Sequence, residues 1–159
     1  MAATVQANRS SGERAALLPY AGFQMRAVAF ILDLIVMGSF FLLFFTIAFL
    51  PVALAGGSHL SESETRWVYV VLLSYIPFVP LLFFVLWAWR GQSIGMMAAR
   101  IEVTDRDGEP LSVARALLRT VIWPLSMFPL ALGAVPIPLD DERRALHDMI
   151  AGTVVLELP

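Results

Sequence analysis

Long apolar stretches dominate the pattern of hydrophobic and polar positions along the chain. The first covers residues 27–50, contains one charged residue, Asp33, and ends at Pro51. About 20 apolar residues are enough for a helix to cross the hydrocarbon core of a bilayer. The stretch is also longer than the roughly 7–15 apolar residues of a signal peptide. We therefore expect a transmembrane helix over residues 27–50 that ends at Pro51.

The second apolar stretch covers residues 67–89. Trp67 and Trp89 stand at its two ends, where aromatic side chains commonly mark the interface between lipid and water. Pro77 and Pro80 fall in its middle, and each removes a backbone N–H donor. We expect a second transmembrane helix here, kinked by the two prolines.

The third apolar stretch, residues 120–139, is interrupted by prolines. They are Pro124, Pro129, Pro136 and Pro138. We expect a helical segment over about residues 113–139 that these prolines break. The segment either spans the membrane or re-enters it as a hairpin, and the hairpin requires that the freed backbone groups be buried in protein.

Two short segments have the character of β-strands. Residues 100–104 alternate polar and apolar side chains, and residues 152–158 are rich in β-branched and apolar side chains. Residues 105–110, which lie between the first of these segments and the next predicted helix, have strong turn chemistry. Each segment is too short to be stable alone. We expect the two to pair on one side of the membrane, in either a parallel or an antiparallel sense.

These elements together predict an all-α integral membrane protein with two transmembrane helices, a proline-broken third segment and a small cytoplasmic β pairing. The composition agrees, because 58% of the residues are hydrophobic and 15% are charged, against roughly 45–50% and 25% in soluble domains. The length of 159 residues suits one domain. We expect residues 1–21 to form a flexible N-terminal tail and residues 22–159 a single membrane domain.

The arginines predict the orientation of the chain. The loop of residues 51–66 carries one arginine, whereas the segment up to Arg26 carries three and the segment of residues 90–119 carries five. Because positive residues favour the cytoplasmic side, we expect the N-terminus and residues 90–119 in the cytoplasm and residues 51–66 outside. A third segment that turns back would bring the C-terminus to the cytoplasm as well.

Arg26 and Asp33 carry the candidate chemistry of the first helix. They are seven residues apart, so they share a helix face and differ by about 10 Å in height. An acid this deep costs about 2.5–3.5 kcal/mol, so Asp33 either forms a structural salt bridge or binds a proton or ion. Helical side chains lean toward the N-terminus, which strains a direct pair. We expect a third group, Arg119 or Asp148, to reach between them.

Other classes of function are less compatible with the sequence. Without cysteine and with two histidines, the chain offers no thiol chemistry and a weak case for a metal site. We find no nucleophile or cofactor motif, so we expect no enzyme, no cofactor and no metal. The net charge of −2 argues against nucleic acid as a partner. Gly91 and Gly95 form a G-x-x-x-G, which we interpret as a tight turn into a short helix over residues 94–99.

Several motifs in order resemble the RDD family of bacterial membrane proteins. Arg26 matches its arginine, Asp33 its first aspartate, and Asp148 within residues 146–155 its second aspartate. Residues 91–103 resemble the segment that follows the second helix in that family. The resemblance covers about residues 22–158. It implies a multi-pass protein of the bacterial cytoplasmic membrane and suggests ligand transport or ion exchange.

We carry two functional hypotheses forward. In the first, the protein is a transport or ion-exchange component, with Arg26, Asp33 and Asp148 as one polar cluster supported by Arg119. In the second, the protein is an accessory or assembly subunit of a larger membrane complex, and the same cluster is a structural lock. Two or three crossings enclose little pathway, so transport requires a homo-oligomer. Both hypotheses make the lipid bilayer a partner, together with further copies of the chain or other membrane subunits.

Overall fold

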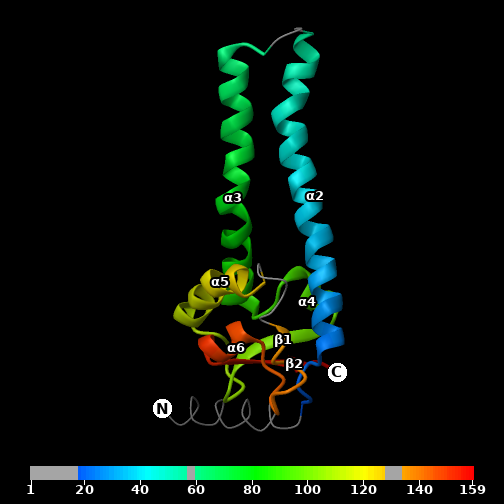
Figure 1. Ribbon diagram of the computed structural model, residues 1–159, viewed down its shortest axis with the longest axis vertical. Coiled ribbons are helices and arrows are strands. Elements are labelled where there is room, and N and C mark those ends of the chain that lie inside the picture. Colours follow the sequence, from blue (N-terminus) through cyan, green and yellow to red (C-terminus); the bar gives the residue numbers. More distant parts are fainter. Residues whose placement is uncertain (1–17, 57–59, 128–133) are drawn as a thin grey trace.

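The computed structural model describes residues 18–56, 60–127 and 134–159. Two long helices, α2 (Phe23–Ala55) and α3 (Glu62–Arg90), lie side by side as a hairpin (Figure 1). All the other described elements gather at one end of this hairpin, where α2 begins and α3 ends (Figure 1). We call this group the base of the hairpin. Its elements, in chain order, are α4 (Ile94–Ala98), β1 (Ile101–Asp105), α5 (Val113–Met127), α6 (Leu146–Ala151) and β2 (Thr153–Glu157).

The α2 and α3 helices correspond to the two predicted transmembrane helices. Among the described residues, these two are long and apolar enough to cross a membrane. Both extend past the apolar stretches that predicted them. At the start of α3, Ser61 and Glu64 form a capping box, in which each side chain accepts a hydrogen bond from the backbone of the other residue. Such polar caps satisfy the free N–H groups of the first turn and add a turn that hydropathy does not reveal.

The end of α2 differs from the prediction. The helix does not stop at Pro51 but continues to Ala55 and ends at Gly56, which adopts the left-handed conformation. Proline within a helix leaves the carbonyl four residues earlier without its usual donor, and here that carbonyl belongs to Ile47. The indole of Trp67 on α3 donates to the Ile47 carbonyl over 3.4 Å. The neighbouring helix thus replaces the hydrogen bond that proline removes.

Aromatic side chains fill much of the interface between α2 and α3. Phe44 packs against Tyr75 and Phe78, with ring centroids 5.5 and 5.2 Å apart. The hydroxyl of Tyr75 donates to the carbonyl of Met37 over 2.8 Å. Nearer the base, Trp123 of α5 stacks on Phe83 of α3 at 5.2 Å. This contact between Trp123 and Phe83 fixes α5 against the part of α3 nearest the base.

The two strands pair antiparallel, with Val103 opposite Val155. The segment before α2 joins them, because the amide of Ala21 donates to the carbonyl of Val155 over 2.8 Å. Ile101, Val103 and Val155 are fully buried. The chain before α2, the chain after α3 and the C-terminal segment therefore meet around one small core.

The predicted third segment is described only in part. Its helix is α5, 15 residues long, and residues 134–140 form turns instead of continuing it. Residues 128–133 and, in the N-terminal tail, residues 1–17 lie outside the described residues. The choice between a spanning and a re-entrant segment falls partly on that portion. At about 1.5 Å per residue, α5 by itself is shorter than the hydrocarbon core.

Candidate functional site

The carboxylate of Asp148 lies between two arginines that come from distant parts of the chain. One of its oxygens accepts from Arg119 on α5 and the other from Arg26 on α2. We call these three residues the ion triad. Asp148 is fully buried, Arg119 is 1% exposed and the Arg26 side chain 10%. The triad thus connects α2, α5 and α6 at the base of the hairpin.

Arg26 is held by more than this ion pair. Its Nε donates to the carbonyl of Ala21 over 3.0 Å, and its Nη2 donates to the carbonyl of Arg143 over 2.7 Å. The planar guanidinium presents several donors in a fixed geometry, so one side chain joins the start of α2 to the turn before α6. On the other side of the triad, Arg119 also donates to Thr153 Oγ1 over 3.0 Å.

The electrostatics keep Asp148 ionised. Burial on its own raises the pKa of this carboxyl, but the charges of Arg119 and Arg26 outweigh it and hold the pKa well below the usual range. The amide of Ala145 donates a further hydrogen bond of 2.9 Å to the same carboxylate. A group in this state is unsuited to take up and release a proton near neutral pH.

His147, next to Asp148, is neutral in the folded chain. Burial, together with the charge of Arg119, lowers its pKa to about 3. Burial also lowers the pKa of Arg119, and the neighbouring Asp148 carboxylate offsets part of this effect. With two charged guanidinium groups, one carboxylate and a neutral imidazole, the triad and His147 carry one excess positive charge.

Asp33 belongs to a different set of hydrogen bonds. Its Oδ2 accepts from the hydroxyl of Ser93 over 2.6 Å, and its Oδ1 accepts from the amide of Gly95 over 2.7 Å. Ser93 in turn accepts from the amide of Met96. The structure therefore brings Arg26 and Asp148 together with Arg119. It places the Asp33 side chain of α2 against the turn that leads into α4. Polar groups of that turn satisfy the buried acid without an arginine.

Both glycines of the G-x-x-x-G are required by close backbone contacts. Gly91 ends α3 with a φ of 64°, and a Cβ atom there would lie 2.5 Å from the carbonyl oxygen of Val103. A Cβ atom on Gly95 would lie 2.0 Å from the carbonyl oxygen of Ala29 on α2. As expected, the motif forms a tight turn into a short helix, α4. Here Gly95 also allows α4 to touch α2 within the same chain.

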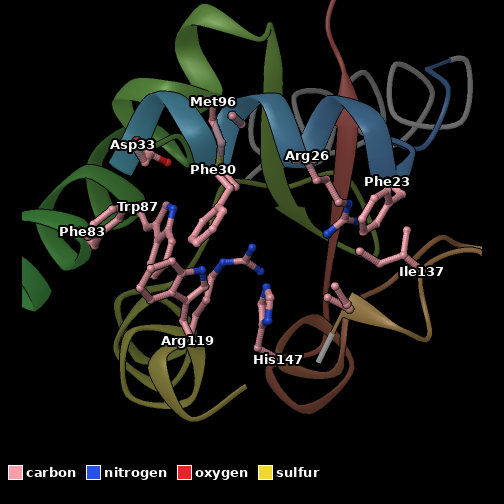
Figure 2. A pocket seen from close by; sticks show the side chains of 15 residues that line it. Phe23, Arg26, Phe30, Asp33, Phe83, Trp87, Met96, Arg119, Ile137 and His147 are labelled. Atoms are coloured by element: carbon pink, nitrogen blue, oxygen red, sulfur yellow. The ribbon is translucent and has the colours of Figure 1, made fainter. Parts of the chain in front are cut away.

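A small cavity of about 140 Å³ lies beside the triad. Its lining combines apolar side chains with several polar ones, and Figure 2 shows them converging from α2, α3, α5 and α6. Arg119 lies with its guanidinium 5.0 Å from the ring centre of Trp87. Within the described ranges of the chain, no three His, Asp or Glu side chains gather as a metal site.

The sequence analysis did not identify Ser93 and Trp87 as site residues. Ser93 lies inside the glycine motif and is the N-cap of α4, and a small hydroxyl residue just before a helix start is a common capping group. Trp87 lies in the apolar stretch of α3, and nothing in its spacing separates it from Trp89. The structure separates them clearly, since Trp87 is 1% exposed and Trp89 is 79% exposed.

The family comparison matches the region that contains this site. The model of the RDD family matches residues 20–152, a range that includes Arg26, Asp33, Arg119 and Asp148. A Bacillus subtilis (strain 168) protein named uncharacterized protein YckC is 29% identical over 140 residues, which cover 85% of this chain and 83% of that protein. No solved structure matches the chain significantly. The match to the family model over most of the length establishes that the chain belongs to the RDD family.

Proposed function

We propose that this protein is an accessory or assembly subunit of a larger membrane complex, and that the ion triad is its structural lock. The observation that carries the proposal is the state of Asp148, whose two oxygens are both bound by buried or nearly buried arginines. Removing one partner of such a buried pair costs about 3–5 kcal/mol. A site of this kind holds α2, α5 and α6 together, and both oxygens of Asp148 are already bound and not free for a transported cation.

The arginine distribution supports an orientation for the proposed subunit. The base of the hairpin contains α4, α5, α6 and both strands, and its chain segments hold most of the arginines. At the opposite end of the hairpin, Arg66 lies near the start of α3. By the preference of positive residues for the cytoplasm, the base and the N-terminus lie in the cytoplasm. The protein then crosses the bacterial cytoplasmic membrane twice and presents a compact cytoplasmic module to its partners.

Ion exchange is the second candidate, and Asp33 is the observation in its favour. This acid lies within the apolar part of α2 and lines the small cavity. Acids in membrane helices commonly belong to ion or proton pathways. Two helices enclose little pathway, so this function requires a homo-oligomer, whereas the accessory function also allows association with other membrane subunits.

Reconstitution of the purified protein into liposomes tests both candidates. The liposomes contain a pH-sensitive dye and are exposed to a sodium gradient. We expect the same dye response as in liposomes without protein. A sodium-dependent response that Asp33→Asn abolishes, at unchanged amounts of folded protein, would instead establish ion exchange. For the accessory function, Asp33→Asn lowers the amount of folded protein, and mild-detergent purification from native membranes yields a stoichiometric complex.

A further inference from the structure

The small cavity contains two buried donors that are not used within the fold. The Nε1 atom of Trp87 and the Nε atom of Arg119 find no hydrogen-bond acceptor among the described residues. Both residues line the cavity and are 1% exposed. A buried donor without an acceptor costs about 1–3 kcal/mol, so native structures rarely leave one. Two donors without an acceptor among the described residues, both beside one cavity, suit the acceptor group of a ligand in that cavity.

The positive charge of the site selects the kind of acceptor. The ion triad has one excess positive charge, and Figure 2 shows the side chains of Arg119 and His147 close together, below Phe30 of α2. Asp33 also lines this cavity, where Ser93 and Gly95 each donate a hydrogen bond to it. Figure 2 shows Asp33 on the far side of Phe30 from the Arg119 guanidinium, so the two charges lie at different ends of the cavity. The end of the cavity at Arg119 therefore suits an anionic oxygen.

A larger apolar cavity adjoins the small one. Its volume is about 680 Å³, and it lies between α2, α3 and α5. The two cavities share four lining residues: Phe30, Phe83, Trp87 and Trp123. From there the larger cavity follows α2 and α3 past Leu34, Met37 and Val79, away from the base. Its mostly apolar lining suits a hydrocarbon chain that enters from the bilayer.

We infer that the protein binds one long-chain carboxylate, a fatty acid taken from the bilayer. The carboxylate lies in the small cavity and accepts hydrogen bonds from Trp87 Nε1 and Arg119 Nε, and the hydrocarbon chain fills the larger cavity. The size of the small cavity supports this choice, because a cavity of about 150 Å³ has room for a molecule such as benzene. A carboxylate fits this space, and a phospholipid headgroup with its glycerol does not. This site does not depend on the accessory function.

Quenching of tryptophan fluorescence by dibromostearate tests the proposal. The measurement uses the full chain in mild detergent with Trp67→Phe, so that the signal comes from the cavity residues Trp87 and Trp123 and from the exposed Trp89. We expect saturable quenching that oleate reverses and oleyl alcohol, which lacks the carboxylate, does not. Equal displacement by the alcohol would overturn the proposal, and so would displacement by phosphatidate but not by oleate.

Two matched variants on α3 locate the binding site. Trp87→Phe keeps an aromatic ring and removes the Nε1–H donor, while Trp89→Phe changes an exposed residue two positions away. The quenching that oleate reverses reports on Trp123 in the Trp87→Phe variant, because Trp89 does not line the cavities. We expect about a fivefold weaker affinity for dibromostearate in Trp87→Phe, which corresponds to one hydrogen bond of about 1 kcal/mol. Trp89→Phe should bind like the parent. Melting temperatures show whether Trp87→Phe is folded, and a folded variant with unchanged affinity would refute the site.

Discussion

The amide of Gly95 donates a hydrogen bond of 2.7 Å to the carboxylate of Asp33. This bond joins the first turn of α4 to the N-terminal part of an apolar helix, 62 positions earlier in the chain. It explains an acid in a stretch that otherwise suits lipid. The carboxylate accepts from a free N–H group at the start of a short helix, as a capping side chain does, and so fixes α4 against α2.

The contact at Gly95 predicts a steric effect. Gly95→Ala places a Cβ atom 2.0 Å from the Ala29 carbonyl oxygen, so α4 must move away from α2 and from Asp33. We expect a loss of about 1–3 kcal/mol in the free energy of unfolding, measured by thermal unfolding in detergent. Gly38→Ala is the control, because a Cβ atom there meets nothing within 4 Å. Equal melting temperatures for the two variants would contradict the close approach.

The ion triad predicts a large difference between two arginines of α5. Arg119→Met leaves Asp148 with one arginine in a fully buried site, and we expect a loss of about 3–5 kcal/mol in the free energy of unfolding. Arg115→Met removes an ion pair with Asp105 in which the Arg115 side chain is 42% exposed. For that variant we expect at most about 1 kcal/mol. Denaturant titration of both variants by circular dichroism compares them, and similar losses would rule out a structural role for the triad.

The pKa of His147 predicts how stability depends on pH. Its value is about 3 in the folded chain against an ordinary 6.5. Between these two values the unfolded chain binds more protons than the folded chain, so stability falls as the pH is lowered through that window. From pH 7 to pH 5 we expect a loss of about 2 kcal/mol. Thermal unfolding across this range measures it.

The variant His147→Gln provides the control for the pH prediction. It removes the titrating imidazole, so the melting temperature should change less between pH 7 and pH 5 than in the parent. Asp148 does not contribute in this range, because its lowered pKa makes its stabilisation disappear only as the pH falls below its ordinary value of 3.8. If the parent and the variant had the same pH profile, the pKa of His147 would not be lowered in the folded chain.

The proposed orientation predicts which sites react with a membrane-impermeant thiol reagent. The chain contains no cysteine, so single cysteines report without background. Ser63→Cys lies at the far end of the hairpin, and Asp107→Cys lies at the base, in the turn after β1. On intact cells we expect labelling of Ser63→Cys and not of Asp107→Cys, and labelling of both after the membrane is opened. The reverse pattern on intact cells would place the base outside.

Hydropathy predicts the two long helices because their stretches are long and uniformly apolar. Their ends are harder to predict, as Pro51 illustrates. The helix continues through this proline, and a tryptophan from the facing helix satisfies the carbonyl left free. That compensation depends on a contact between residues 20 positions apart. A local rule for proline does not include it, and so the predicted boundary was too early.

The site residues could be predicted better than their arrangement. An acid in apolar surroundings identifies Asp33, because burial of a charge is costly. Arg26 follows from its place on the same helix face, and the resemblance to the RDD family identifies Asp148. Their partners depend on how the base folds. Arg119, one of the two groups expected to reach between Arg26 and Asp33, binds Asp148. The Ser93 hydroxyl and the Gly95 amide, at the start of α4, bind Asp33, and the sequence does not indicate that α4 lies against α2.

The position of β2 in the chain determines when the base can close during synthesis. This strand pairs with β1 and accepts a hydrogen bond from the segment before α2, and it follows α6, the helix that carries Asp148. A ribosome therefore makes both long helices, Arg26 and Arg119 before it makes the carboxylate that binds both arginines and the strand that closes the base. Residues synthesised after α5 thus complete contacts that begin with α2. Until Asp148 is made, a growing chain carries two guanidinium groups without the carboxylate that later binds them.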